Sequence, residues 1–401
     1  MYTPLLASLL LSPALPRKIA LPPIAAVHPN QSLLGYDHKL DIISGSQFSG
    51  LTTFARIPYL NCFLDSEAES GPYDIAILGA LFDTAVTAHP GARYGPGGIR
   101  LGSRRIGGWN IYTGENVFES WAKLVDCGDA PLTWLDNTVA LKQLDLAHEV
   151  LSSRITNSTD LGRTPRIITL GGDHTTTLSA LRSTYRHWGL VSVIHFDSHI
   201  DTRDPKAAVS LIMRKSHRIL QELYSSNSGV NHGTFLHLAH EEVSRPHPPI
   251  KSHSIGPYPQ RLHPRRHPSP RRPPQGDIRN DIGCGFSIIK ARDLDRLGIA
   301  GVVEDIKSRV GDSRVYISVD IDVLDPAFAP ATGTAEPGGL TPRELLSILD
   351  ALRGLPVIGA DVVEVAPIYD AAAETTTLAA AEVAHSLLGL MVATPVIDQA
   401  E

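Results

Sequence analysis

His195-Phe-Asp-Ser-His-Ile-Asp-Thr202 is the stretch that decides how this 401-residue chain is interpreted. It follows an apolar run at 189–194, and a short β-branched run of this kind predicts a buried strand. Side chains alternate in extended chain, so we expect Asp197, His199 and Asp201 to point the same way. A helix cap needs one oxygen, not two carboxylates with an imidazole between them. The stretch therefore predicts a cation site where a strand ends.

The rest of the chain alternates strand-like and helix-like segments. Apolar runs predict strands at 73–80, 123–129, 165–170, 313–319 and 356–364, and helical spacing predicts helices at 135–151, 176–187, 341–352 and 374–391. The density of glycine and proline at 89–100 predicts an ordered loop there instead of a helix. Continuously apolar strands that alternate with helices indicate an α/β protein with a mostly parallel sheet covered on both faces.

Several predicted strands end in acidic or metal-capable side chains. Besides the opening stretch, the residues at such ends are His174, Asp320, Asp322 and Glu364. Ligands of open α/β sheets bind beyond the carboxyl ends of the strands. We therefore expect all of these side chains to share one rim of the sheet.

The rim gathers four aspartates and two histidines, namely His174, Asp197, His199, Asp201, Asp320 and Asp322. So much negative charge is not buried without cations. Two divalent ions would balance the four carboxylates, and ligation by carboxylate and imidazole without thiolate favours manganese or a similar hard ion. A two-metal site lowers the pKa of water to about 7 and so yields hydroxide near neutral pH. A single structural metal ion is the alternative.

Three motifs in the chain resemble signatures of the ureohydrolases, the arginase/agmatinase family. They are Gly171-Gly-Asp-His174, the opening stretch, and Ser318-Val-Asp-Ile-Asp-Val-Leu-Asp-Pro-Ala-Phe-Ala-Pro-Ala-Thr-Gly-Thr334. The third is very specific. Asn231-His-Gly-Thr-Phe235 and Glu364-Val-Ala-Pro367 add to the resemblance, and segments 91–100 and 362–395 resemble the agmatinase branch, particularly its fungal-type members. Residues 50–400 are accordingly expected to form one ureohydrolase domain.

The resemblance implies a three-layer α/β/α fold and a centre of two Mn²⁺ ions. One ion would be bound by His174, Asp197, Asp201 and Asp320, and the other by Asp197, His199, Asp320 and Asp322, so that Asp197 and Asp320 bridge them. Catalytic and substrate-binding roles are implied for Asp201 as proton carrier, for His232 as proton shuttle or substrate contact, for Glu364 as holder of the guanidinium, and for Thr334 as a substrate contact. Glu364 also suits that role chemically, because a carboxylate pairs with a planar fork of N–H donors.

The implied activity is hydrolysis of a small guanidino compound. Agmatine, giving putrescine and urea, is the first expectation, because the segment after the opening motif reads Thr202-Arg-Asp-Pro205, as in agmatinase-like enzymes. A guanidinobutyrase or arginase-type hydrolase is one alternative, and an inactive metal-binding homologue is another. The resemblance also suggests a homo-oligomer, either a trimer or a hexamer.

Two segments, 206–228 and 244–275, depart from the family pattern. The second is crowded with proline and arginine, and proline at such density is not expected to supply a central strand. Family-like sequence resumes at Gly276. We therefore expect this chain to lack one strand of the sheet, through a true insertion or an error of reading frame or splicing.

Composition limits the partners of the protein. The net charge of −6 gives no footprint for nucleic acid, and no stretch approaches the length of a transmembrane helix. Three cysteines, Cys62, Cys127 and Cys284, are too few and too scattered for a disulfide framework or a zinc ribbon.

The first 20 residues suggest a signal peptide or other leader. An apolar run of signal-peptide length is present, although the basic pair Arg17-Lys18 follows it instead of preceding it. The triplets that begin at Asn30 and Asn157 would permit glycosylation. Secretion is therefore one expectation, and a cytoplasmic or mitochondrial location is the alternative.

Overall fold

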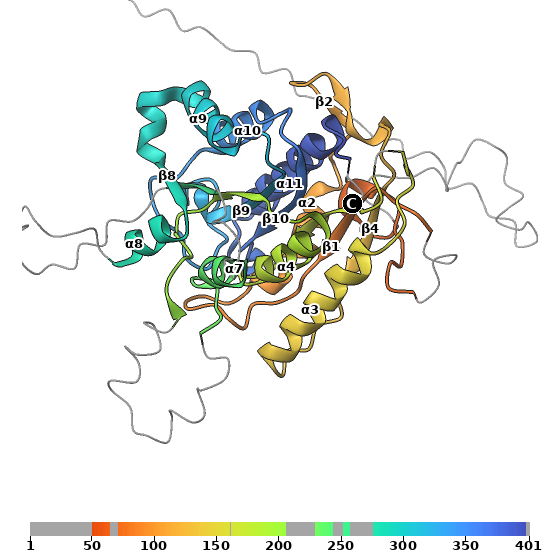
Figure 1. Ribbon diagram of the computed structural model, residues 1–401, viewed down its shortest axis with the longest axis horizontal. Helices are drawn as coiled ribbons and strands as arrows, with labels where there is room; N and C mark the ends of the chain where they lie inside the picture. The colour runs from red at the N-terminus through yellow and green to blue at the C-terminus, as the bar shows by residue number, and fades with distance from the viewer. Residues whose placement is uncertain are drawn as a thin grey trace, which may run out of the picture. The chain divides into compact units, whose positions relative to one another are not determined.

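An eight-stranded sheet lies at the centre of the computed structural model, which describes residues 50–64, 71–160, 162–205, 229–243, 252–256 and 276–397 (Figure 1). In spatial order its strands are β4 (Leu124–Asp129), β1 (Ile75–Gly79), β5 (Arg166–Leu170), β10 (Val357–Val363), β9 (Val315–Asp320), β6 (Ser192–Phe196), β7 (Ser252–Gly256) and β8 (Phe286–Lys290). Each pairing between neighbours is parallel. Strands β1, β5, β6, β9 and β10 are buried along their whole length, which explains their continuous apolar runs.

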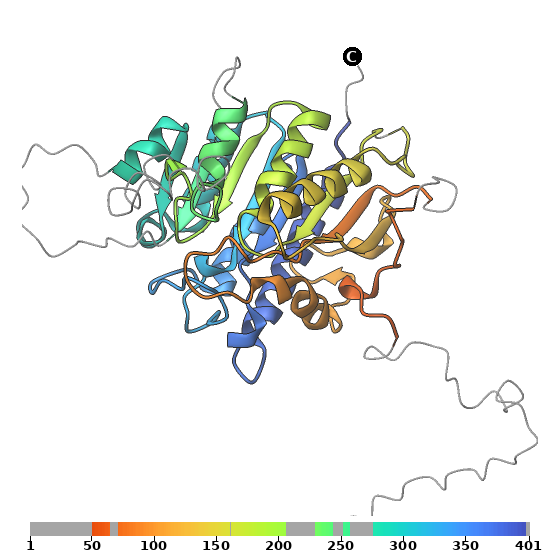
Figure 2. The same ribbon diagram turned by 90° about the horizontal axis from the view of Figure 1, so that it is seen from below.

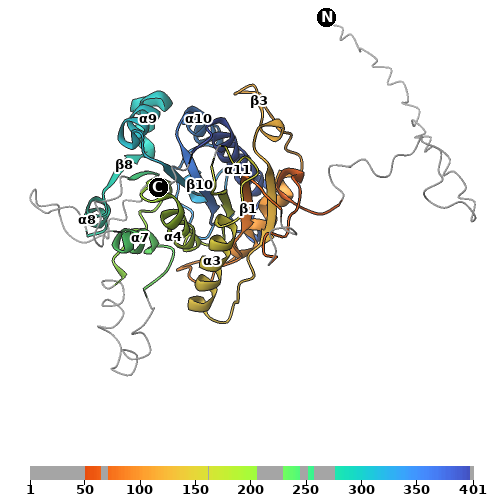
Figure 3. The same ribbon diagram turned by 45° about the vertical axis from the view of Figure 1, so that its right-hand side comes forward.

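Helices cover both faces of the sheet (Figures 2 and 3). On one face, α4 (Thr176–Trp188) packs between α3 (Asn137–Ser152) and α7 (Phe235–Val243). On the other, α11 (Thr375–Ala393) contacts α2 (Gly95–Ser103) and α10 (Pro342–Ala351), and α10 contacts α9 (Leu294–Val310). The remaining elements are α8 (Gly276–Gly283), the hairpin of β2 (Trp109–Asn110) and β3 (Glu115–Asn116), and the short 3₁₀ helices η2 (Phe54–Arg56), η3 (Ala92–Tyr94), η4 (Val117–Glu119), η5 (Ala291–Asp293), η6 (Ile321–Val323) and η7 (Pro367–Tyr369).

This architecture confirms the predicted three-layer α/β/α fold. The strands predicted from apolar runs correspond to β1, β4, β5, β6, β9 and β10, and the predicted helices correspond to α3, α4, α10 and α11. The start of α10 is a capping box: Thr341 Oγ1 accepts from Glu344 N–H at 3.2 Å, and Glu344 Oε2 accepts from Thr341 N–H at 2.8 Å.

The prediction of a loop without helix at 89–100 is wrong, because α2 begins at Gly95. Its proline lies in the first turn, where a missing N–H costs no helical hydrogen bond. Its glycines serve close packing against α11: a Cβ on Gly102 would lie 2.8 Å from the carbonyl oxygen of Thr377. Glycine here allows two helices to approach, and the helix persists despite its low propensity.

The prediction that 244–275 supplies no strand is also wrong. Strand β7 pairs in parallel with β6 on one side and β8 on the other. Its five residues, Ser-His-Ser-Ile-Gly, fall in a window free of proline between Pro249 and Pro257. The high proline content of the whole segment hid this short window from the prediction. Because the window has no proline, each of its residues keeps the backbone N–H that pairing in a sheet requires. The other departing segment, 206–228, and the predicted leader at 1–20 lie outside the described residues.

The cysteines differ from expectation as well, since Cys62 and Cys127 form a disulfide with Cα atoms 5.4 Å apart. Cys284 is free and buried. Sixty-five positions separate the paired cysteines, so sequence spacing alone gave no sign of the bond.

Helix α11 corrects the statement about transmembrane length. Its 19 residues are long and apolar enough to span a membrane by length and composition, and 72% of the apolar window is buried inside the protein. It is the buried helix that the Ala- and Leu-rich pattern predicts, packed against β10, α2 and α10.

Candidate metal centre

The candidate site lies at the carboxyl ends of four neighbouring strands, β5, β10, β9 and β6. His174 follows β5 after a Gly-Gly-Asp turn, and Asp197 directly follows β6. Asp320 ends β9, and Glu364 directly follows β10. All four side chains are buried. The structure thus brings them together at one edge, as the strand-end argument expects, while their individual roles stay predictions.

The first group of ligand atoms surrounds the His174 ring. Its Nδ1 lies 3.0 Å from Asp197 Oδ2 and 3.2 Å from an oxygen of both Asp201 and Asp320. One ring nitrogen cannot donate to three carboxylates. Atoms of His174, His195, Asp197 and Asp201 all lie within 4.8 Å of one another. A convergence of this kind fits a cation better than a set of hydrogen bonds.

A second group adjoins the first and shares Asp197 with it. His199 Nδ1 lies 2.9 Å from Asp322 Oδ2 and 3.4 Å from Asp197 Oδ1. Asp197 therefore directs Oδ2 towards the first group and Oδ1 towards the second, as a bridging carboxylate would. Asp320 approaches His174 with Oδ2, while its Oδ1 accepts from Asp322 N–H at 2.8 Å.

The opening stretch reaches this arrangement by a different backbone path from the expected one. Strand β6 ends at Phe196, so Asp197, His199 and Asp201 lie on an irregular segment and not on an extended strand. Asp201 has a φ of 49°, in the left-handed region that costs a non-glycine residue about 1 kcal/mol or more. The three side chains still converge on one site, but a tight bend aims them, not alternation.

His174 is held in one tautomer by a chain of hydrogen bonds. Ser318 Oγ donates to Asp361 Oδ1 at 2.6 Å and lies 2.8 Å from His174 Nε2. A hydroxyl that gives its proton to Asp361 must accept from the ring, so Nε2 carries the hydrogen. Tyr316 and Thr177 donate to the other oxygen of Asp361. Once Nδ1 is deprotonated, its lone pair is thereby directed into the cluster of three carboxylates, as ligation requires.

The pKa values at the site show how unbalanced this charge is. Burial and the charges of Asp322 and Asp197 hold the pKa of Asp320 well above its usual value. Burial also raises the pKa of Asp322, with Asp197 adding to the shift. Burial alone would lower the pKa of His174, but Asp197, Asp201 and Asp320 outweigh it and raise that pKa. Protons are retained where a divalent cation would relieve the same repulsion. The donor set therefore fits a divalent metal.

Glu364 borders the cluster with one oxygen committed and the other available. Its Oε1 accepts from His174 N–H at 2.8 Å and lies 3.0 Å from His232 Nδ1. Its Oε2 is buried and has no hydrogen-bond partner among the described residues. Glycine at 333 keeps this side open, because a Cβ there would lie 2.8 Å from the carbonyl oxygen of His89 and 3.7 Å from Oε2. The φ of Glu364, 60°, is again left-handed.

His232 links Glu364 to the loop after β1. Its Nε2 lies 3.0 Å from Thr87 N and 2.7 Å from Thr87 Oγ1. A backbone N–H only donates, so Nε2 accepts and Nδ1 carries the proton that is donated to Glu364. Burial lowers the pKa of His232, but Glu364 outweighs it and raises the pKa to about 9. A ring protonated on both nitrogens, which this raised pKa favours near pH 7, could not accept from Thr87 N–H, so its Nε2 would have to turn away from Thr87.

Thr334 lies at the second group of ligand atoms. Its hydroxyl is 3.4 Å from Asp322 Oδ2, so the described contact is with a predicted ligand. Its role as a substrate contact stays a prediction.

Several buried residues of the site were not singled out from the sequence. His195 Nε2 lies 2.9 Å from Asp197 Oδ2, and the i, i+2 spacing of these residues was a usable signal. Asp281 accepts from Thr202 Oγ1 at 3.2 Å, and burial raises its pKa to about 7. Asp361 lies in mid-strand on β10, where only the tertiary contacts with Ser318 and Tyr316 reveal its function.

Comparison with known proteins places this constellation in one family. The model of the Arginase family matches residues 73–389, which include every residue of the site. "Putative agmatinase 1" of Schizosaccharomyces pombe is 46% identical over 370 residues, covering 88% of this chain and 85% of the relative. "Proclavaminate amidinohydrolase" of Streptomyces clavuligerus is 32% identical over 342 residues, covering 85% of this chain and 93% of the relative.

The solved structures agree with the sequence relatives. The proclavaminate amidino hydrolase structure from Streptomyces clavuligerus has a TM-score of 0.68 at 30% identity, covering 87% of this chain and 99% of that one. A hypothetical agmatinase from Burkholderia thailandensis has a TM-score of 0.66 at 29% identity, covering 86% of this chain and 92% of that one. Both share the arrangement of sheet and helices described above.

Proposed function

This chain belongs to the arginase family, and on that premise we propose that it hydrolyses agmatine to putrescine and urea at a centre of two Mn²⁺ ions. Family membership makes it a hydrolase that acts on guanidino compounds. The finer proposal is supported above all by Glu364, whose buried and unpartnered Oε2 lies at the edge of the His/Asp cluster. The names of the relatives support agmatine as the substrate.

The donor set supports two hard divalent ions. The proposed ligands are His174, Asp197, Asp201 and Asp320 for one ion and Asp197, His199, Asp320 and Asp322 for the other. Oxygen and imidazole ligands without thiolate suit manganese. When bound, such ions supply Lewis acidity, which lowers the pKa of water and so provides a nucleophile near neutral pH.

Glu364 binds and orients the guanidinium in this proposal. Its Oε1 is fixed by His174 N–H and His232, which leaves Oε2 for the substrate. A charge-assisted hydrogen bond in a buried site is strong, and the planar fork of a guanidinium presents two parallel N–H donors to a carboxylate. The central carbon of the substrate is thereby held beside the metal-binding carboxylates, where proximity favours attack.

The leaving amine needs a proton, and two groups are placed to handle one. Asp201 lies beside His174 in the first group and carries a proton from water to the amine. His232 holds the proton of Nδ1 on Glu364, so in this conformation it orients the carboxylate and does not donate from Nε2.

A urea-release assay with Mn²⁺ over agmatine, arginine and guanidinobutyrate tests the proposal. We expect activity on agmatine that falls by about 10³-fold in Asp197→Ala. Loss of this ligand would remove the bound ions, and with them several kcal/mol of charge stabilisation in the transition state. Asp312→Ala, an exposed acid outside the site, is the matched control and should retain full activity. Full activity in Asp197→Ala would refute the ligand assignment, and no urea from any of the three compounds would favour an inactive homologue.

Guanidinobutyrate is the second candidate substrate, favoured by one observation. Arg203 is exposed beside the His232–Gly233 turn, with Nη1 3.9 Å from where a Cβ on Gly233 would lie. A cation there would attract a carboxylate at the far end of the substrate and repel the ammonium of agmatine. If Arg203 contacts the substrate, Arg203→Gln should raise the ratio of activity on agmatine to activity on guanidinobutyrate. An unchanged ratio would remove this argument.

A further inference from the structure

The free edge of the sheet at β4 is covered by an edge arm, residues 54–64. Tyr59 of the arm forms a parallel β-bridge with Asp126. Leu60 N–H donates to Asp126 O at 3.0 Å, and Asp126 N–H donates to Pro58 O at 2.9 Å. The arm therefore satisfies backbone groups that an end strand would otherwise leave exposed. The edge of β4 stays covered only if other contacts hold this short arm in place.

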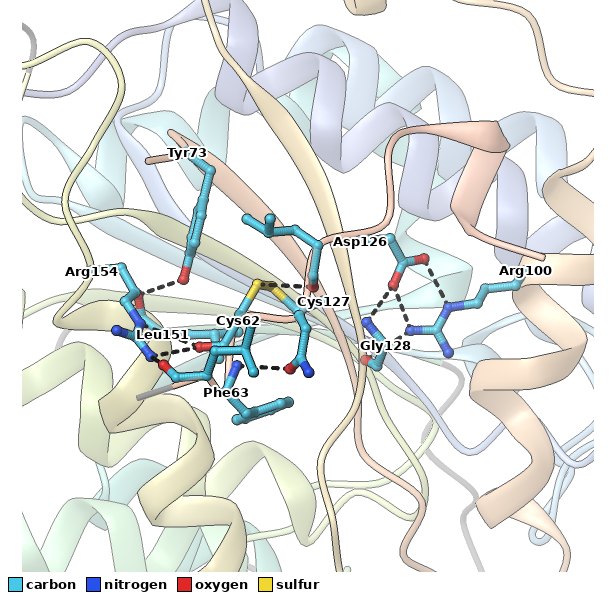
Figure 4. The surroundings of a disulfide bond; sticks show 12 residues. Cys62, Phe63, Tyr73, Arg100, Asp126, Cys127, Gly128, Leu151 and Arg154 are labelled. Atoms are coloured by element: carbon cyan, nitrogen blue, oxygen red, sulfur yellow. Dashed lines mark hydrogen bonds and ion pairs between the residues drawn. A yellow bond between two sulfur atoms is a disulfide. The ribbon is translucent and has the colours of Figure 1, made fainter. Parts of the chain in front are cut away.

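A disulfide fastens the far end of the arm to β4. Cys62 of the arm and Cys127 of β4 are both buried and are bonded to each other (Figure 4). Arg154, just after α3, donates to Cys62 O from Nε at 3.2 Å and from Nη2 at 2.9 Å. Arg154 also donates to the carbonyl oxygen of Leu64. The disulfide is thus buried, and hydrogen bonds from Arg154 hold the backbone on both sides of Phe63 in place.

The third cysteine does not compete for this pairing. Cys284 is free and buried beside β8, at the opposite end of the strand order from β4. Burial raises the pKa of its thiol to about 12, so it carries little thiolate and exchanges slowly. Among the described residues, one pairing is therefore favoured.

A candidate site of N-glycosylation begins three residues beyond Arg154. Asn157-Ser-Thr159 is an acceptor triplet for N-linked glycan, and both Asn157 and Thr159 are exposed on an irregular loop. Ser158 N–H donates to Asp74 Oδ1 at 2.8 Å, which anchors the loop while the asparagine faces solvent. Asn157 is therefore accessible from solvent, as an acceptor of glycan must be.

We propose that this chain matures in an oxidising, glycosylating compartment, where Cys62 and Cys127 are joined and Asn157 receives an N-linked glycan. Structural disulfides form and persist in such compartments and are rare where thiols are kept reduced. The apolar run near the N-terminus agrees with entry into this route. The bond keeps the edge arm over β4, so that the sheet edge stays covered.

Both modifications use co-reactants of that compartment. The Sγ–Sγ bond forms as a disulfide oxidant accepts two electrons and two protons from the thiols, and its own S–S bond breaks to give a dithiol. The glycan is added when Asn157 Nδ2 attacks the anomeric carbon of a lipid-pyrophosphate sugar donor. A C–N bond forms and the C–O bond to phosphate breaks, its electron pair going to the departing lipid pyrophosphate. The amide proton passes to a base of the transferring enzyme.

The first experiment expresses the full chain, residues 1–401, in yeast from its own first residue. We expect protein in the medium with one alkylatable cysteine, Cys284, when it is denatured without reduction. Endoglycosidase digestion should show one glycan fewer in Asn157→Gln than in the wild type. Protein retained in the cytosol, three alkylatable cysteines, or an unchanged glycan number in Asn157→Gln would overturn the proposal.

The second experiment tests what the bond does. In Cys62→Ser/Cys127→Ser we expect a Tm lower by about 5 °C and faster tryptic cleavage after the exposed Arg56, with urea release per folded molecule unchanged. Cys284→Ala keeps the disulfide and is the matched control for cleavage after Arg56. If the double variant does not fold, reduction of the wild-type protein should accelerate the same cleavage. Equal cleavage rates with and without the bond would contradict its role in holding the arm.

Discussion

Two regions of this molecule bury carboxylates in opposite ways. At the β4 edge, Asp126 meets a complete set of donors: Arg100 Nε and Phe54 N–H at Oδ2, and Arg100 Nη2 and Gly128 N–H at Oδ1, all within 2.9 Å. At the ends of β5, β6, β9 and β10, acids instead face other acids, and the described histidines cannot satisfy them all. A carboxylate balanced by a fixed guanidinium supports the fold, whereas an unbalanced cluster is built for ions and substrate that come from outside.

The largest expected effect breaks the balanced region. Asp126→Ala leaves Arg100 buried without its main partner and should cost about 3–5 kcal/mol of unfolding free energy. Asp129→Ala removes the other, half-exposed partner of the same arginine and should cost less than about 1 kcal/mol. Urea release per folded molecule should not change in either variant. Equal costs in denaturant titrations would show that Asp126 is not the balanced acid described here.

The next largest effect is expected on kcat/KM when Glu364, whose Oε2 is available to the substrate, is changed. Glu364→Gln keeps the shape of the side chain but loses its charge and one acceptor, so kcat/KM should fall by about 10²-fold. The Tm should change little, because the substitution leaves no buried charge without its partner. Glu304→Gln, on the exposed face of α9, is the control. Unchanged kinetics in Glu364→Gln would exclude Glu364 as the guanidinium site.

A smaller effect should follow from loosening the His174 ring. Ser318→Ala removes the acceptor that fixes the Nε2–H tautomer and should weaken metal affinity by about 10- to 100-fold. Saturating Mn²⁺ should restore most of the activity, which separates a positioning role from a catalytic one. Ser347→Ala on α10 serves as the control. An Mn²⁺ requirement equal to that of the wild type would contradict the relay through Asp361.

The smallest expected effect on the free energy of unfolding is that of Asp320→Asn, and it has the opposite sign from the effect of Asp126→Ala. Asp320→Asn removes one of the repelling acids, so the metal-free protein should be as stable as the wild type or more stable by about 1 kcal/mol, as measured by thermal unfolding. Its urea release should be lost. A large loss of stability in the metal-free variant would mean that the cluster is balanced without ions.

The same contrast explains what the sequence could reveal. Acids at strand ends, such as Asp197 and Asp320, stand out because a parallel sheet aligns the carboxyl ends of its strands. Asp361 and Ser318 lie within strands, and their contacts span 43 positions of sequence, so no local pattern marks them. The left-handed bend at Asp201 was missed for a related reason, because the surrounding tertiary structure imposes it.

Composition misled the prediction in two places. Glycine at 98 indicated a loop, although it serves the close packing of α2 on α11, where a Cβ would lie 2.9 Å from Thr377 Cγ2. Proline around β7 indicated the loss of a strand, although five residues without proline suffice for the ladder. In both cases an average over a window hid the property of a few positions. The disulfide was missed because pairing over 65 positions depends on the fold and not on spacing.

The most direct test is a calorimetric titration of metal-free protein with Mn²⁺ at pH 7 in buffers of different ionisation enthalpy. Ligation requires the acids and His174 to give up the protons that their raised pKa values retain. We predict two ions bound per chain, with net release of protons to the buffer, and loss of at least one ion in Asp197→Ala. No binding, or binding without proton release that persists in Asp197→Ala, would contradict a metal centre at this edge of the sheet.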